Sequence, residues 1–155
     1  MYISFFLSVF LDDGLIYSFG SNQYGALGRP TESGSPSPLY SAVPAIVKSL
    51  QDTFIHQVAA GNYHNLAVDV EGLLYVWGDN SEGQCGQGTL AEEIRPSYVK
   101  TMMAVGKVDQ IAAGTFHSSA ITSSGHLYTW GSGEDGCLGY FPETYTPGYV
   151  EVYTI

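Results

Sequence analysis

A motif that occurs three times dominates this chain of 155 residues. Each copy contains Tyr, one further residue, Phe or Trp, Gly, four residues, Gly, two residues and a final Gly. The copies begin at Tyr17, Tyr75 and Tyr128, so the period is 58 and then 53 residues. Repeats of this length indicate a row or ring of similar units, because a single unit cannot bury its apolar surface alone.

The aligned positions of the motif are rings and glycines that we expect to be structural. They are Phe19, Trp77 and Trp130, with Gly20, Gly25, Gly28, Gly78, Gly83, Gly86, Gly131, Gly136 and Gly139. A second block repeats at residues 58–68 and 111–121, and it places His64 and His117 in the same slot. Catalysis needs a residue at one site and not once per repeat. We therefore predict that both histidines are structural, each linking a loop to its neighbour through a side-chain hydrogen bond.

Each copy also predicts a β-hairpin. The turns fall at Asp13-Gly14, Glu71-Gly72 and Ser124-Gly125, where the glycine takes a positive φ. The strand after Gly72 places Tyr75 and Trp77 on one face and Leu74 and Val76 on the other. Both faces are apolar, so we expect this strand to lie between two layers. The small segment Ala-Ala-Gly suits an inner strand where neighbouring sheets crowd together. No segment predicts a helix of ten residues.

Two alternatives for the glycine-rich segment 83–88 are a phosphate-binding loop and a site around Cys85. A phosphate loop opens a helix, but here two acidic residues and Pro96 follow, and no Gly-Lys-Ser/Thr is present. Cys85 fills the slot of Leu27 and Leu138, which favours a core position. Cys137 lies one slot earlier in its own copy. We therefore expect neither a disulfide nor a zinc site, and we expect the protein to be in a reducing compartment.

The chain is acidic, with 15 Asp and Glu against 5 Lys and Arg and a formal net charge of −10. Binding to nucleic acid needs a basic surface, so we expect no nucleic-acid partner for this segment. The five bases lie between the repeats and form no cluster in the sequence: Arg29, Lys48, Arg95, Lys100 and Lys107.

Several acidic residues occupy the four-residue loop that follows the aromatic strand. They are Asp79, Glu82, Glu134 and Asp135. One hypothesis is that they are solvated loop tips that keep the domain soluble. The other is that they project side by side from consecutive copies as an acidic rim that meets a basic protein partner. These four residues are the candidate partner-binding residues.

The apolar N-terminus, residues 1–11, resembles neither a signal peptide nor a membrane span. It lacks a positive start and a small-residue cleavage site, and it is too short to cross a bilayer. We predict a strand there and no membrane association. No combination of residues predicts a catalytic centre, a metal site or a cofactor.

The pattern Ala-Ala-Gly-x-x-His, a hairpin and then Tyr-x-Trp-Gly-x4-Gly-x-Leu-Gly resembles the regulator of chromosome condensation repeat. The resemblance implies an all-β propeller of antiparallel strands, which in this family usually has seven blades. Three copies form an incomplete arc, since even small propellers need about four blades. We expect one repeat domain over residues 1–155, with copies of about 1–57, 58–110 and 111–155. We also expect it to be a fragment of a longer propeller that supplies the remaining blades.

The resemblance implies a non-catalytic scaffold that binds another protein through its blade loops. One alternative is guanine-nucleotide exchange on a small Ran-like GTPase, although no wedge-like extension is evident. Another is the substrate-binding arm of a larger enzyme, such as a HECT-type ubiquitin ligase. The expected partner is a protein, with a small GTPase as one candidate, and the expected location is intracellular, in the cytoplasm or nucleus.

Overall fold

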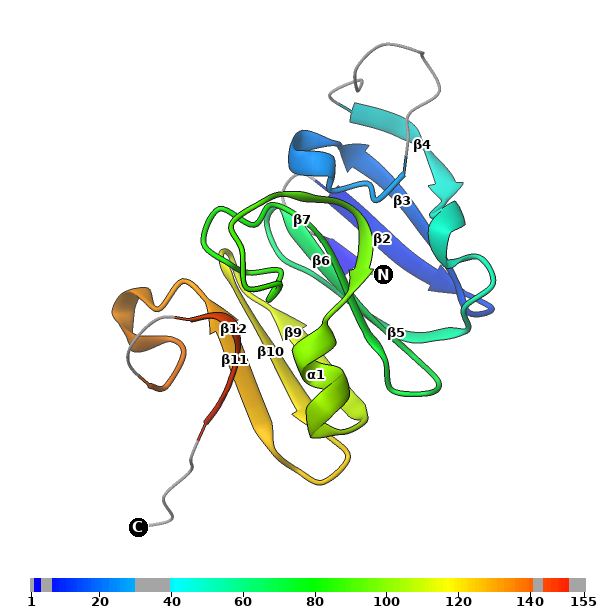
Figure 1. Cartoon of the computed structure of the whole chain (residues 1–155). Coiled ribbons are helices and arrows are strands. Elements are labelled where there is room, and N and C mark those ends of the chain that lie inside the picture. The colour runs from blue at the N-terminus through cyan, green and yellow to red at the C-terminus, as the bar shows by residue number, and fades with distance from the viewer. Residues whose placement is uncertain (1, 4–6, 30–39, 141–143, 151–155) are drawn as a thin grey trace.

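The computed structural model describes residues 2–3, 7–29, 40–140 and 144–150. These residues form three four-stranded antiparallel sheets, which lie side by side in chain order as a row of blades (Figure 1). In each sheet the spatial order of the strands follows the chain. The predicted all-β fold is confirmed, and within the described residues the row of sheets forms an arc that does not close.

Apart from the two-residue β1, the strands of the three sheets have five to seven residues. The first sheet contains β1 (Tyr2–Ile3), β2 (Leu7–Asp12), β3 (Leu15–Ser21) and β4 (Tyr40–Ile46). The second contains β5 (Ile55–Ala60), β6 (His64–Asp69), β7 (Leu74–Gly78) and β8 (Glu93–Tyr98). The third contains β9 (Val108–Ala113), β10 (His117–Thr122), β11 (Leu127–Gly131) and β12 (Thr144–Tyr149). Short helices connect them: η1 (Gln23–Gly25), η2 (Lys48–Leu50), α1 (Lys100–Val105) and η3 (Glu134–Gly136).

The N-terminal segment differs from the single strand that its sequence predicts. It contributes two strands, because Tyr2 pairs with Val9 and Ile3 with Ser8 in an antiparallel register. Residues 1 and 4–6 lie outside the described residues. The extra strand gives the first sheet the same four members as the others, although this segment lacks the Ala-Ala-Gly block.

The inner strands lie where the sheets crowd together, as the small residues predict. Strand β5 contacts both β2 of the preceding sheet and β9 of the following one. Ala59 on β5 is buried. A Cβ atom at Gly61, just after β5, would lie 2.5 Å from the carbonyl oxygen of Gly114 in the next sheet. The Ala-Ala-Gly block therefore allows the backbones of adjacent sheets to approach closely.

Strand β7 lies between two layers, as its apolar faces predict. Trp77 packs into a core shared with the first sheet, which includes Ile16 and Leu27. Leu74 and Val76 on the other face pack into a core shared with the third sheet. Each sheet therefore stabilises its neighbour through apolar contacts, and the second sheet links the two cores.

A tryptophan at each junction fixes one sheet to the loop of the preceding sheet. The indole Nε1–H of Trp77 donates to the carbonyl oxygen of Ala26 at 3.0 Å, and that of Trp130 donates to Gln84 at 2.8 Å. Both rings are fully buried. A Cβ atom at Gly28 would lie 2.7 Å from the indole nitrogen of Trp77, and its φ is +66°. Only glycine fits beneath the ring in this left-handed conformation.

We predict that Trp77→Ala and Trp130→Ala each lower the free energy of unfolding by about 3–5 kcal/mol, since each removes a buried ring and leaves a cavity. Urea denaturation measures the change. Tyr40→Ala is the control, because this ring is 69% exposed and its loss should cost at most about 0.5 kcal/mol. If the tryptophan variants unfold like the control, the rings do not hold the junctions.

Candidate interaction surface

Three equivalent loops follow β3, β7 and β11, and they lie along the same edge of the row of sheets (Figure 1). Their shape depends on the nine glycines of the motif, all of which have a positive φ, between +66° and +111°. In this way the sequence repeat becomes a repeat of loop conformation, and the loops present equivalent positions to solvent.

Asparagine side chains hold the first two loops in shape through hydrogen bonds inside each loop. The sequence-based predictions did not include these asparagines. Asn22 Oδ1 accepts from the backbone N–H of Leu27, and Asn80 Oδ1 accepts from that of Cys85. Asn80 also donates through Nδ2 to the carbonyl oxygen of Thr89 at 2.7 Å. Both asparagines stand two positions after the first glycine of the motif. The repeat alignment therefore contained the signal that would have revealed them.

Asp79 does not project from its loop, contrary to its predicted place in an acidic rim. It is 3% exposed. Its carboxylate accepts from the backbone N–H and the hydroxyl of Ser81 and from Gln84 Nε2 at 2.9 Å. A carboxylate with several donors is satisfied inside the loop, so Asp79 shapes the loop and is not available at its surface.

The other three candidate residues are exposed at the loop tips. Glu82 and Asp135 occupy the slot immediately before the second glycine of the motif, and Glu134 precedes Asp135. Among the described residues, none of these carboxylates forms an ion pair. The loops therefore present three acidic side chains to solvent.

A row of aromatic rings accompanies these loops. The ring centroids of Tyr24 and Tyr63 are 5.5 Å apart, and those of Tyr63 and Phe116 are 6.4 Å apart. Tyr24 is 37% exposed, and the other two rings are half-buried. The carbonyl oxygen of Tyr63 accepts from the N–H of Asp79, and that of Phe116 accepts from Ser132. These bonds attach the aromatic row to the acidic loops; together the row and Glu82, Glu134 and Asp135 are called the loop face.

His64 lies beneath the loop face in a buried hydrogen-bond chain. Its Nε2 is 2.9 Å from Ser118 Oγ on the third sheet, and this hydroxyl donates to the carbonyl oxygen of Gln84. Since the one hydroxyl proton of Ser118 is used, Nε2 of His64 must be the protonated nitrogen and the donor. Burial lowers the pKa of His64 to about 3, with a smaller contribution from nearby His117. His64 is therefore a neutral link between two sheets.

His117 occupies the equivalent position in the third sheet. Its ring lies against Gly114 as that of His64 lies against Gly61, and it is only half-buried. Phe19, in the slot of the two tryptophans, is likewise half-buried. Trp77 and Trp130 face a preceding sheet, and His64 faces a following one. Within the described residues, Phe19 has no preceding sheet and His117 has no following sheet to cover it.

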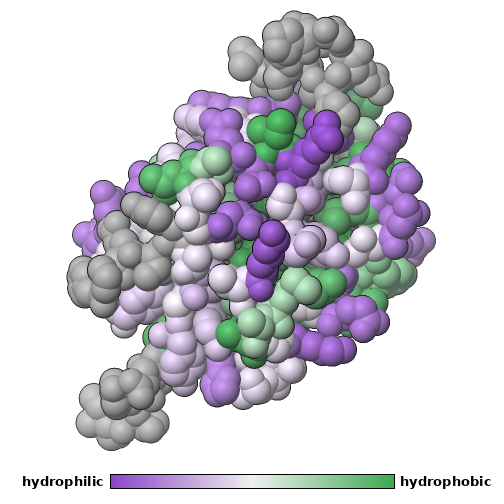
Figure 2. Space-filling model, viewed as in Figure 1, coloured by the Kyte–Doolittle hydropathy of each residue, from purple (hydrophilic) through white to green (hydrophobic). Residues whose placement is uncertain are grey.

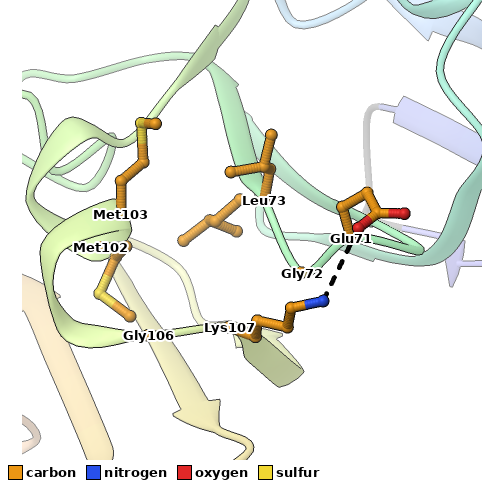
Figure 3. A pocket seen from close by; sticks show the side chains of 8 residues that line it. Glu71, Gly72, Leu73, Met102, Met103, Gly106 and Lys107 are labelled. Carbon is orange, nitrogen blue, oxygen red and sulfur yellow. Dashed lines mark ion pairs between the residues drawn. The ribbon is translucent and has the colours of Figure 1, made fainter.

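A small pocket lies at the opposite end of the strands, beside the hairpin turn at Gly72. Met102 and Met103 of α1 line one side and Leu73 the other, while Lys107 Nζ lies 3.7 Å from Glu71 Oε2 (Figure 3). Its volume is about 210 Å³, below the range of about 300–1,000 Å³ usual for ligand clefts. The ion pair is exposed and stabilises the turn little.

Hydrophobic side chains form separate patches among hydrophilic ones on the face in Figure 2. Within the described ranges, no group of three or more His, Cys, Asp or Glu is placed to hold a metal ion. No helix in the same ranges is long and apolar enough to cross a membrane.

We predict that His64 makes stability depend on pH. Its pKa in the folded chain is below the usual value of 6.5, so its contribution is complete above that value and is lost as the pH falls towards 3. Between about pH 7.5 and about pH 5.5 the free energy of unfolding should fall by about 1.4 kcal/mol from this group. In His64→Gln this part of the decrease should be absent, and in exposed His56→Gln it should remain. Equal slopes in both variants would contradict the assignment.

The two cysteines should differ in reactivity. Cys85 is fully buried in the core and its pKa is raised, mainly by burial and further by Glu93 and Asp79. Cys137 is exposed. Iodoacetamide should therefore modify Cys137 in the native chain and Cys85 only after unfolding, because the thiolate is the nucleophile. Mass spectrometry of the labelled peptides measures this, and rapid labelling of Cys85 in the native state would show an open core.

Comparison with known proteins agrees with the repeat pattern and the blade-like sheets. The family model for the regulator of chromosome condensation (RCC1) repeat matches residues 13–68 and 71–121, and a second model of the same description matches residues 55–84 and 108–137. Human E3 ubiquitin-protein ligase HERC2 is 38% identical over 130 residues, which cover 83% of this chain and 2% of that protein. Arabidopsis thaliana ultraviolet-B receptor UVR8 is 36% identical over 124 residues, covering 80% of this chain and 27% of that protein.

A solved structure shows the same fold. Prp20p from Saccharomyces cerevisiae superposes with a TM-score of 0.78 at 22% identity, over 97% of this chain and 37% of that one. This chain thus spans only part of the length of the proteins it resembles. The repeat motif, the three blade-like sheets and the family match together show that the chain belongs to the regulator of chromosome condensation repeat family.

Proposed function

We propose that this chain is a non-catalytic protein-interaction module whose loop face binds a basic segment of another protein. The observation that carries the proposal is the aromatic row beside the exposed Glu82, Glu134 and Asp135. Aromatic residues are enriched at protein interfaces and supply much of their binding energy. Acidic groups around them select a partner of opposite charge.

The rigidity of the loops supports the same function. Asn80 and Gln84 are fully buried and bonded within their loop, and the carbonyl oxygen of Gln84 is held by the next sheet. A surface that is ordered before binding loses less conformational entropy when the complex forms. The two free thiols suit a reducing compartment, so we place this activity inside the cell, in the cytoplasm or nucleus.

A second candidate function is that of a substrate-binding arm in a larger ubiquitin ligase. The observation that favours it is the similarity to HERC2, which is named as an E3 ubiquitin-protein ligase. The same loop face would then hold the substrate. Guanine-nucleotide exchange is a third hypothesis, and the nucleotide-release rate of Ran-like GTPases with and without the chain tests it directly.

We predict that reversing the exposed charges slows binding. In the variant Glu82→Lys, Glu134→Lys and Asp135→Lys, a basic partner captured by the wild-type chain should associate about tenfold or more slowly at low salt, because long-range attraction speeds encounter. The dependence of the rate on salt should also flatten. Surface plasmon resonance measures both. Thermal stability should hardly change, since exposed charges contribute little to folding.

The matched control reverses three exposed carboxylates at the hairpin end of the strands, Asp12, Asp52 and Asp109. It produces the same change in net charge on the opposite edge. The control should keep most of the association rate. If both variants slow association equally, net charge and not the loop face attracts the partner, and the proposed surface is wrong.

A further inference from the structure

Three of the five basic residues converge in the folded chain, although they are scattered in the sequence. Arg29, Lys48 and Arg95 line one pocket with Gly28 and Ser49, and its volume is about 260 Å³. The pocket lies where the first sheet meets the second: Arg29 follows the loop after β3, Lys48 begins η2, and Arg95 is on β8. Their scatter in the sequence therefore does not carry over to the folded chain. These five residues are called the basic pocket.

Arg29 forms the fixed wall of the basic pocket. It is 9% exposed. Its Nε donates to Ser18 Oγ, and its Nη2 donates to the carbonyl oxygen of Ser18 and to Ser41 Oγ at 3.0 Å. These bonds hold the guanidinium in one orientation. A cation that is already ordered binds an anion with a smaller loss of side-chain entropy.

Lys48 and Arg95 supply the accessible charges. Both are exposed, and within the described residues neither forms an ion pair. Ser49 also lines the pocket, and a serine hydroxyl is a neutral hydrogen-bond donor. Because the net charge of the chain is −10, this local gathering of positive charge is not a consequence of a generally basic surface.

The next junction shows that the fold does not require these cations. The repeat motif and the strand registers align Arg29 with Gln87, Lys48 with Lys100 and Arg95 with Thr146. The equivalent slots therefore hold one cation where the basic pocket holds three. Residues that are needed to join two sheets should recur at each junction. Because these cations occur together at one junction and not at the next, we infer a role other than holding the sheets together.

We propose that the basic pocket binds a phosphate group carried by a phosphorylated side chain of a protein partner. Exposed Arg95 offers paired N–H donors that match phosphate oxygens, and Lys48 adds a point charge. Arg29, whose Nε and Nη2 already donate within the chain, contributes positive charge from a fixed position. The volume of about 260 Å³ exceeds the space that one phosphate group needs, since a water molecule occupies about 30 Å³ in the liquid. The remaining space accommodates the side chain that bears the phosphate. A long polyanion is disfavoured, because the acidic remainder of the chain repels it.

Titration of the isotope-labelled chain with inorganic phosphate tests the charge recognition. The backbone amides of Gly28 and Ser49 should shift and saturate in nuclear magnetic resonance spectra. The double variant Lys48→Gln with Arg95→Thr should bind phosphate about tenfold or more weakly. The matched variant Lys100→Gln with Lys107→Gln removes two exposed cations elsewhere, and its affinity should stay within about twofold of the wild type. Equal weakening in both variants, or shifts that never saturate, would overturn the proposal.

A short peptide tests the source of the phosphate. A peptide with one phosphoserine should bind about tenfold or more tightly than inorganic phosphate, and the same peptide with serine should not bind. If the phosphopeptide binds no more tightly than inorganic phosphate, the protein-borne part of the proposal is wrong. The loop-face variant with three reversed charges should bind the phosphopeptide at least as well as the wild type. Failure of the loop-face proposal therefore leaves this test unaffected.

Discussion

The hydrogen bond from a buried indole N–H to a backbone carbonyl of the preceding loop is the contact on which the arrangement of the sheets depends. Trp77 makes it to Ala26, and Trp130 makes it to Gln84. The same carbonyls accept a second bond, from Asn65 Nδ2 and from Ser118 Oγ respectively. A buried carbonyl with both lone pairs occupied stabilises its loop, and losing one donor leaves a polar group without a partner. The junction thus couples the core of one sheet to the loop of another.

This coupling explains how a chain of short strands presents an ordered surface. Gln84 accepts through its carbonyl from the third sheet and donates through its side chain to Asp79, so one residue links the junction to its own loop. The aromatic row and the acidic tips rest on this network. The basic pocket lies beside the other junction, next to the loop that carries Ala26. Both proposed binding surfaces therefore depend on the junctions between the sheets.

The sequence predicted those features that repeat. The hairpins, the two-sided strand around Trp77 and the all-β class follow from residue periodicity and from glycines at turns. The sequence-based prediction was wrong where a polar side chain turns inward. An acidic residue in a loop is expected to be solvated, but the donors to Asp79 lie within five residues and hold its carboxylate inside the loop. The sequence also failed where contacts are distant, because Arg29 and Arg95 are far apart in the chain and meet only once the sheets pack. Helix α1 is stabilised by the packing of Met102 into the core. Such tertiary contacts leave little signal in the local sequence, so the helix was not predicted.

Hydrogen exchange of the two indole N–H groups tests the central claim about the junctions most directly. Each proton is buried and donated across a junction, so it should exchange only when the sheets separate or the chain unfolds. Nuclear magnetic resonance spectra after transfer to deuterated water resolve both signals. The structure predicts that the Trp77 and Trp130 indole protons persist as long as the slowest backbone amides of β6 and β7. Exchange of either indole proton at the rate of an exposed tryptophan, while those amides stay protected, would show that the sheets are not held together by these bonds.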